Sequence, residues 1–221
     1  MCLRYAFSVM DRDEVKQRFA LVQIAYELEA RYNIAPTQSV PAIFNDSKNT
    51  LSGALWGMPA QWANEPGKLL FNARAESIDS KPTFRRHFEE SRCLMPANAF
   101  YEWKHPEKRP FRFSLKDDAM FAFAAIYSID KESQRRSCCM ITTENNALVG
   151  QVHNRMPVIL PLMREKEFLD ATPKEAKAML VPFPDSLMGM YELTSRINSS
   201  RVDSPEIIKP QTEKGTLKEY F

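Results

Sequence analysis

The chain has 221 residues, 44% of them hydrophobic and 26% charged, as in an ordinary globular protein with one substantial core. Its formal net charge of +2 excludes binding of nucleic acid through bulk charge, so any such contact needs a local basic surface. The sequence has no signal-peptide pattern and no apolar stretch of membrane-spanning length, so we expect a cytoplasmic protein without membrane contact.

The first notable residue is Cys2, which directly follows Met1. A side chain this small normally permits removal of the initiator methionine, which leaves a thiol and a free α-amine on adjacent carbons. Such an aminothiol can condense with an aldehyde and close to a thiazolidine, or attack an amide with its own amine as base. Position alone also allows a buried small hydrophobe, and retention of Met1 would block both chemistries.

The periodicity of the chain predicts more strands than helices. Apolar residues at Val15, Phe19, Val22 and Tyr26 predict an amphipathic helix over residues 13–31, started by Asp11 or Asp13 and ended before Pro36. Two later helices are predicted, one over residues 163–170 and one that begins at the capping box of Thr172 to Glu175. Alternating apolar runs predict strands over residues 40–44, 50–56, 91–95, 99–103, 111–115, 120–128, 137–143 and 158–160.

These elements do not alternate regularly along the chain, which disfavours a parallel doubly wound sheet. We therefore expect a single α+β domain with a curved, mainly antiparallel sheet, barrel-like, and flanking helices. The four cysteines, Cys2, Cys93, Cys138 and Cys139, lack the spacing of a zinc site. We expect no metal and no cofactor, and reduced thiols.

Two segments place polar groups where a core pattern would not. Residues 71–77 bring an amide, a guanidinium and a carboxylate close together, although an ordinary loop does the same. In residues 95–104, alternation puts Glu102 on the strand face shared by Phe100. A carboxylate among aromatic rings tends to have a raised pKa and suits acid–base catalysis; an exposed edge-strand glutamate is the alternative.

A third polar segment covers residues 151–157, ahead of an apolar strand. His153 could transfer a proton near neutral pH, and Arg155 could bind a phosphate. A histidine with a structural role and a solvated arginine are the plain alternatives.

Together these segments form an ordered pattern: Met1-Cys2-x-Arg4, residues 32–38 (YNIAPTQ), Trp56-Gly57, residues 72–76 (NARAE), residues 92–103 and residues 153–157. This pattern resembles the SOS response-associated peptidase (SRAP) family, whose members protect abasic sites in DNA. The matches run to about residue 210, which implies an SRAP-like domain over 1–210 and a polar tail over 211–221.

The resemblance implies that Cys2 captures the open-chain aldehyde of an abasic sugar as a thiazolidine, a covalent DNA–protein crosslink. It assigns Asn72 to orienting the sugar, Glu102 to moving protons and His153 to acting on the sugar oxygens. The imine that precedes ring closure also offers a route to strand cleavage. The family name adds an autopeptidase activity, beginning with removal of Met1.

As partner, the resemblance implies single-stranded or junction DNA with abasic sites, bound by a monomer associated with the nucleoid. The expected DNA-binding residues are arginines for phosphates, tryptophans that stack on bases or wedge a duplex end, and one asparagine: Arg4, Arg74, Arg85, Arg155, Trp56, Trp62, Trp103 and Asn33.

Two other functions fit the same residues. An N-terminal-nucleophile hydrolase would turn over amides without DNA. A non-covalent single-strand binder would leave Cys2 without a chemical role. The near-neutral charge disfavours the binder, because such proteins gain most of their affinity from neutralising phosphates.

Overall fold

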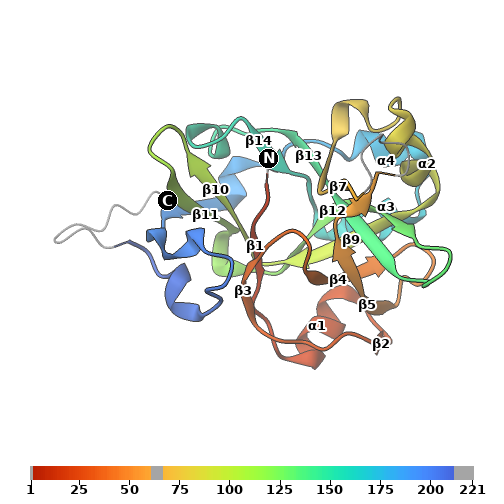
Figure 1. Cartoon of the computed structure of the whole chain (residues 1–221), viewed down its shortest axis with the longest axis horizontal. Helices are drawn as coiled ribbons and strands as arrows, with labels where there is room; N and C mark the ends of the chain where they lie inside the picture. Colours follow the sequence, from red (N-terminus) through yellow and green to blue (C-terminus); the bar gives the residue numbers. More distant parts are fainter. Residues whose placement is uncertain (1, 61–66, 212–221) are drawn as a thin grey trace.

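The computed structural model describes residues 2–60 and 67–211 (Figure 1). Five strands form the barrel: β4 (Ser39–Phe44), β5 (Thr50–Trp56), β9 (Arg92–Ala97), β12 (Phe121–Ile129) and β13 (Arg136–Glu144). Four of their pairings are antiparallel, in the order β5-β4-β9-β12-β13, and a parallel pairing of β13 with β5 closes the ring. The expected α+β domain with a barrel-like, mainly antiparallel core is confirmed.

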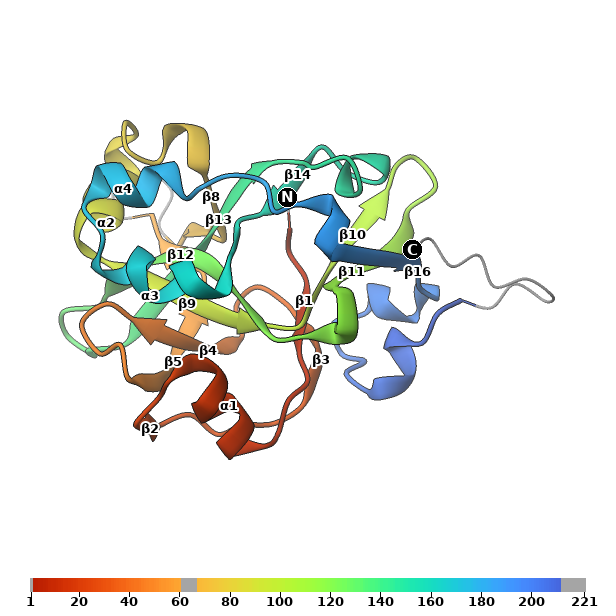
Figure 2. The ribbon, with the colours of Figure 1, turned by 180° about the vertical axis from the view of Figure 1, so that it is seen from behind.

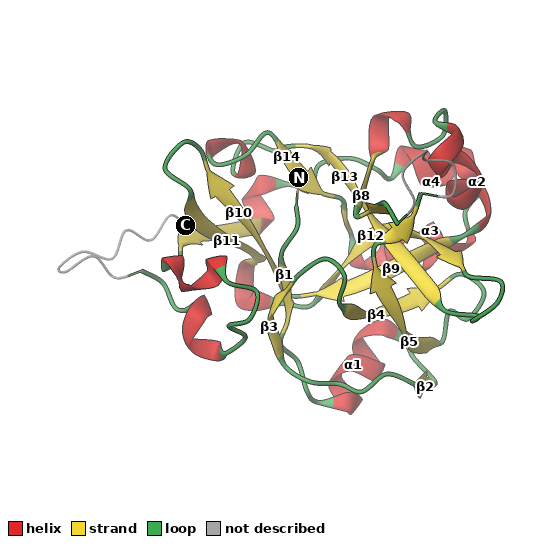
Figure 3. Ribbon diagram, in the orientation of Figure 1, coloured by secondary structure: helices red, strands yellow, loops and turns green. Residues whose placement is uncertain are grey.

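A second sheet of five antiparallel strands lies beside the barrel (Figure 3). Its strands, in spatial order, are β16 (Met188–Glu192), β11 (Arg109–Leu115), β10 (Ala99–Lys104), β1 (Tyr5–Phe7) and β3 (Arg31–Ile34). The chain passes from the barrel to this sheet at Asn98, the single residue between β9 and β10. In this sheet β1, near the start of the chain, pairs antiparallel with β10, the strand that carries Glu102.

Strand β13 brings two distant segments to its two edges. On one edge it pairs in parallel with β8 (Asn72–Arg74), and on the other it pairs antiparallel with β14 (Arg155–Pro157). Thr142 lies opposite Arg74 in the first ladder and Pro157 in the second. Residues more than 80 positions apart in the sequence are thus held one strand apart.

The remaining short strands are β2 (Gln23–Ile24) beside β5, β15 (Ile159–Leu160) beside β12, and the pair β6 (Met58–Pro59) with β7 (Leu69–Leu70). Aromatic rings fill the core where the barrel meets the second sheet. The Tyr5 ring meets Trp56 and Phe123 edge-on at 5.4 and 5.6 Å, and Phe100 stacks on Phe113 at 5.0 Å. Such contacts add to the stabilisation from burial alone.

Helices cover the outside of the barrel. Helices α2 (Pro82–Glu90) and α3 (Leu162–Asp170) pack on β9 and β12, and α4 (Pro173–Ala178) packs on α3 (Figure 2). This cover explains why β12 is apolar on both faces, with eight of its nine residues buried. The predicted capping box is confirmed: Thr172 Oγ1 accepts from Glu175 N, and Glu175 accepts from Thr172 N.

The expected helix over residues 13–31 is wrong beyond residue 19. Helix α1 (Arg12–Phe19) is capped by Asp11, as predicted, but ends at Ala20, whose φ of 50° is left-handed. The backbone N–H of Val22 then donates to Asn49 O beside β5, so the chain continues as strand β2. Pairing with the barrel outweighs the helical spacing of Val22 and Tyr26.

The eight predicted strands are confirmed within one or two residues at their ends. The short 3-10 helices are η1 (Ala75–Ser77), η2 (Lys116–Asp118), η3 (Val149–Gln151), η4 (Asp185–Leu187), η5 (Ser195–Asn198) and η6 (Pro205–Ile208). No helix within the described ranges is long and apolar enough to cross a membrane.

Candidate functional site

Cys2 lies three residues before the start of β1 and is fully buried. Its Sγ donates a weak hydrogen bond to Arg4 O at 3.6 Å. Burial raises the pKa of the thiol far above its ordinary value, and the nearby Glu102 carboxylate raises it further. The thiol is therefore protonated at neutral pH and requires a base before it can attack.

Glu102 supplies an acid–base group beside this thiol. The carboxyl is only 4% exposed, on the face of β10 shared with Phe100, as the alternation predicts. Burial raises the pKa of Glu102 to about 7, although the positive amino terminus and the Trp103 backbone lower it. Near neutral pH the carboxyl is thus close to half protonated and able both to give and to take a proton.

Asn72 connects Cys2 to the barrel strand β13. It is the first residue of β8, where it lies opposite Met140 of β13, and its Nδ2 donates to Cys2 O at 3.0 Å. The structure thereby brings Cys2, Asn72 and Glu102 together, although their sequence positions are far apart.

Asn72 Oδ1 and Glu102 Oε1 are both buried without a hydrogen-bond partner. A buried acceptor that lacks a donor costs roughly 1–3 kcal/mol, so such atoms call for an explanation. Two unpartnered acceptors beside one thiol indicate a site that receives hydrogen-bond donors from a ligand or from a processed chain terminus.

His153 lies between η3 and β14, with Nδ1 3.1 Å from both the backbone nitrogen and the backbone oxygen of Arg155. Burial lowers the pKa of the imidazole, and the positive amino terminus lowers it further. The ring is therefore neutral at pH 7.

The guanidinium of Arg155 binds within the protein. It forms a two-pronged ion pair with Glu76, at 2.6 and 3.0 Å, and donates to Thr142 O at 2.7 Å. Its Nε is buried without a partner. Arg74, two residues beyond Asn72, is exposed. The sequence alone does not show that Glu76 holds Arg155. The pairing depends on β13, which lies between β14, where Arg155 is, and β8, which leads into η1 and Glu76.

Arg4 and Asn33, two of the expected DNA contacts, bind each other and backbone oxygens of residues 197–202. Arg4 Nη1 donates to Asn33 Oδ1 at 2.8 Å and to Ile197 O at 3.0 Å, and Nη2 donates to Asn198 O at 3.1 Å. Asn33 is fully buried, so in this structure its side chain offers no contact to DNA. Trp103 is partly exposed, and its Nε1 donates to Asn198 Oδ1 at 2.7 Å.

The expectation that Trp56 stacks on bases is corrected by the structure. Its ring is fully buried at the end of β5, edge-on to Tyr5, and its Nε1 donates to Phe71 O at 3.0 Å. A base would reach it only if the core opened. Trp62, the next tryptophan in the sequence, lies outside the described residues.

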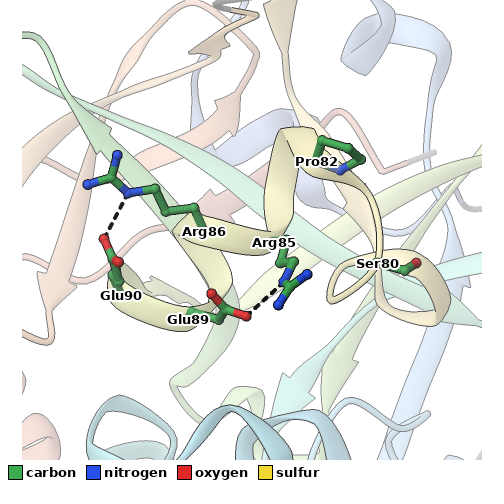
Figure 4. A pocket seen from close by; sticks show the side chains of 6 residues that line it. All are labelled: Ser80, Pro82, Arg85, Arg86, Glu89 and Glu90. Atoms are coloured by element: carbon green, nitrogen blue, oxygen red, sulfur yellow. Dashed lines mark hydrogen bonds and ion pairs between the residues drawn. The ribbon is translucent and has the colours of Figure 1, made fainter.

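Arg85 is not brought to the site. It lies on α2, which Figures 1 and 2 show well apart from β1. Arg85 and Arg86 form ion pairs along the helix with Glu89 and Glu90, each at 3.0 Å, around a shallow hollow (Figure 4). The carboxylates beside both guanidiniums make this hollow poorly suited to a phosphate.

Among the described residues, no three His, Cys, Asp or Glu side chains gather to hold a metal ion. All four cysteines are buried free thiols.

Comparisons with known proteins find a matching family model, related sequences and a similar solved structure. The family model described as SOS response associated peptidase (SRAP) matches residues 1–200. Abasic site processing protein YoaM of Bacillus subtilis is 36% identical over 225 residues, covering 94% of this chain and 97% of the relative. Abasic site processing protein YedK of Escherichia coli is 24% identical, covering 95% and 100%. A crystal structure of a Bacteroides thetaiotaomicron protein superposes with a TM-score of 0.84 at 25% identity, covering 96% and 100%.

Proposed function

Since the chain belongs to the SOS response associated peptidase family, we propose that it acts in DNA repair by capturing abasic sites in a covalent crosslink at Cys2. The printed names of its relatives, abasic site processing proteins, support the substrate class. One observation carries the chemistry: a buried thiol at position 2 lies beside a buried carboxyl whose pKa is raised to about 7.

The reaction begins with removal of Met1, which converts the amide nitrogen of Cys2 into an amine. The amine attacks the aldehyde carbon of the open abasic sugar, and the carbonyl oxygen leaves as water to give an imine. The thiol then adds to the imine carbon, and its proton passes to the nitrogen. One C–N and one C–S bond form, one water is released, and the product is a thiazolidine.

Glu102 suits the proton transfers of both steps. In its protonated form it donates to the departing hydroxyl, and as a carboxylate it accepts a proton from the thiol. A pKa near the working pH keeps both forms populated. The raised pKa of the Cys2 thiol makes this base necessary, because the thiolate does not form on its own.

Asn72 and His153 complete the proposed site. Asn72 Nδ2 fixes the Cys2 carbonyl, and its unpartnered Oδ1 accepts either from the sugar hydroxyl or from the new α-amine. His153, neutral at pH 7 and fixed by the Arg155 backbone, acts on the sugar oxygens. The imine also gives the route to strand cleavage that we include in the proposal.

The proposed partner is single-stranded or junction DNA, bound by a monomer associated with the nucleoid. Exposed Arg74 lies two residues from Asn72, and partly exposed Trp103 follows Glu102. Both are therefore proposed DNA contacts at the rim of the site. Arg155 can bind a phosphate only if the DNA displaces Glu76 from the Arg155 guanidinium.

The test uses a single strand whose uracil has been removed by uracil-DNA glycosylase, incubated with protein lacking Met1. We expect an adduct that survives heat and denaturant in wild type and is absent in Cys2→Ala. The matched control is the same strand after borohydride reduction, which removes the aldehyde and should abolish the adduct. An equal adduct with the reduced strand would contradict aldehyde capture.

The same preparation separates the two other functions. Turnover of amide substrates without DNA, lost in Cys2→Ala, would favour the N-terminal-nucleophile hydrolase. Equal affinity for abasic DNA in Cys2→Ala and wild type, without any adduct, would favour the non-covalent binder.

A further inference from the structure

The start of the chain is fastened to a segment near its end, residues 193–210, which we call the C-terminal segment. This segment contains η5 and η6, and its apolar residues Leu193, Ile197 and Ile207 are fully buried against Ala6 and Tyr101 of the second sheet. Two of the contacts that hold it come from Arg4, two residues after Cys2, whose guanidinium donates to Ile197 O and Asn198 O.

Asn33 is the centre of this attachment. Its Nδ2 lies within hydrogen-bond distance of three backbone oxygens of the C-terminal segment, those of Ile197 at 3.2 Å, Ser199 at 2.9 Å and Val202 at 2.8 Å. Its Oδ1 accepts from Arg4 Nη1 at 2.8 Å. A fully buried amide with every polar atom engaged serves the protein interior and does not contact DNA.

Asp203 fixes the backbone of Asn33 from the same segment. Its carboxylate accepts from Tyr32 N at 2.5 Å and from Asn33 N at 3.1 Å, and it pairs with Arg31 Nε at 2.6 Å. These charge-assisted hydrogen bonds set the position from which the Asn33 side chain reaches Arg4.

Arg4 connects this attachment to Cys2, the proposed nucleophile. While its guanidinium is held by Asn33 and the C-terminal segment, its backbone oxygen accepts from Cys2 Sγ at 3.6 Å and from Tyr101 N at 3.0 Å. Tyr101 precedes Glu102 on β10, so this oxygen lies between the thiol and the strand that carries the carboxyl.

We propose that Asn33 is a positioning residue for the crosslinking reaction, which holds Arg4, and with it Cys2, in register with Glu102 through the C-terminal segment. This inference rests on the proposed function. Displacement of a reacting group by about 1 Å is enough to slow a reaction on the order of a hundredfold, so loss of the attachment should act on rate.

The competing explanation is that Arg4 binds a DNA phosphate and Asn33 merely supports it. The two differ in what they change. A lost phosphate contact weakens affinity and lowers the slope of log affinity against log salt by about one. A lost positioning contact leaves affinity and slope in place and lowers the rate at saturating DNA.

The experiment compares wild type, Asn33→Ala and a matched control, Asn98→Ala, all lacking Met1. Asn98 is also a buried asparagine, but it binds Ser8 beyond the other end of β1. Three quantities are measured: the rate of adduct formation at saturating abasic single strand, the affinity for undamaged strand at several salt concentrations, and the melting temperature.

In Asn33→Ala we expect the saturating rate to fall on the order of tenfold or more, with affinity within about twofold and an unchanged salt slope. Asn98→Ala should keep the wild-type rate. An unchanged rate in a folded Asn33→Ala protein overturns the inference, and so does a loss confined to affinity with a lowered slope.

If Asn33→Ala does not fold, Asp203→Asn decides, because it leaves the Asn33 side chain in place and alters a partly exposed carboxylate. The expected result is again a slower saturating rate with unchanged affinity, and an unchanged rate overturns the inference. A wild-type protein that forms no adduct contradicts the proposed function itself, and the inference falls with it.

Discussion

Replacing Glu102 by Gln should make the protein more stable above neutral pH and should slow the proposed crosslinking reaction. The pKa of this carboxyl lies at about 7, raised by burial from 4.5. A shift of that size corresponds to roughly 3 kcal/mol of preference for the protonated form in the folded state. The glutamine side chain has nearly the same shape and carries no charge to desolvate.

The direction of this change in unfolding free energy follows from proton binding. Between pH 4.5 and about 7 the folded wild type holds a proton that the unfolded chain has released, so its unfolding free energy falls as pH rises through this window. The variant lacks this titration. Its advantage in unfolding free energy over wild type should therefore grow by roughly 2 kcal/mol between about pH 5 and about pH 8.

Urea denaturation of both proteins at these two pH values measures the difference directly, because most other titrating groups cancel between them. The adduct-formation rate at saturating abasic strand is measured in parallel, and single-strand affinity should stay unchanged. A stability difference that is the same at both pH values would refute the raised pKa. Equal loss of affinity and rate would show that Glu102 is structural.

Three substitutions away from the reacting atoms test the architecture. Arg92→Ala should lower the unfolding free energy by at least about 3 kcal/mol, because the buried guanidinium donates to backbone oxygens at the ends of α2 and α3. A loss below about 1 kcal/mol, measured by urea denaturation, would contradict this role of Arg92. Thr172→Ala should cost about 1 kcal/mol by thermal denaturation and leave the crosslinking rate unchanged; an unchanged melting temperature would argue against the capping box. Trp56→Phe should cost about 1 kcal/mol with single-strand affinity within about twofold, whereas a tenfold loss of affinity would restore Trp56 as a stacking residue.

Local patterns were sufficient to predict most of the strands but not their arrangement. Runs such as residues 50–56 and 120–128 are apolar over a strand's length and bounded by turn residues, so they define strands without tertiary information. The parallel ladder between β5 and β13 closes the barrel. It pairs Leu55 with Ser137, which are far apart in the sequence, so no local pattern predicts it. Helix α1 is shorter than its apolar spacing suggests because β2 gains a partner strand.

The proposed reacting residues could be named from the sequence because each carries its own chemistry at a matching motif position. Cys2, Asn72 and Glu102 do lie together, and burial raises the pKa of Glu102, as expected for a carboxylate on the strand face that it shares with Phe100. The surrounding residues were harder to assign. Asn33 and Trp56 are polar-tipped side chains in motif segments, and only the packing of distant segments shows that both lie inside the protein.

The central claim, a thiazolidine at Cys2, is tested most directly by counting thiols in the adduct. The chain has four cysteines, all free in the structure. Protein lacking Met1 is crosslinked to the abasic strand, denatured, alkylated and measured by intact mass. The account predicts an adduct that is one water lighter than its two components and carries three alkylated thiols where the uncrosslinked protein carries four. An adduct with four alkylated thiols would show that the link is an open imine or lies elsewhere, and would contradict the ring closure.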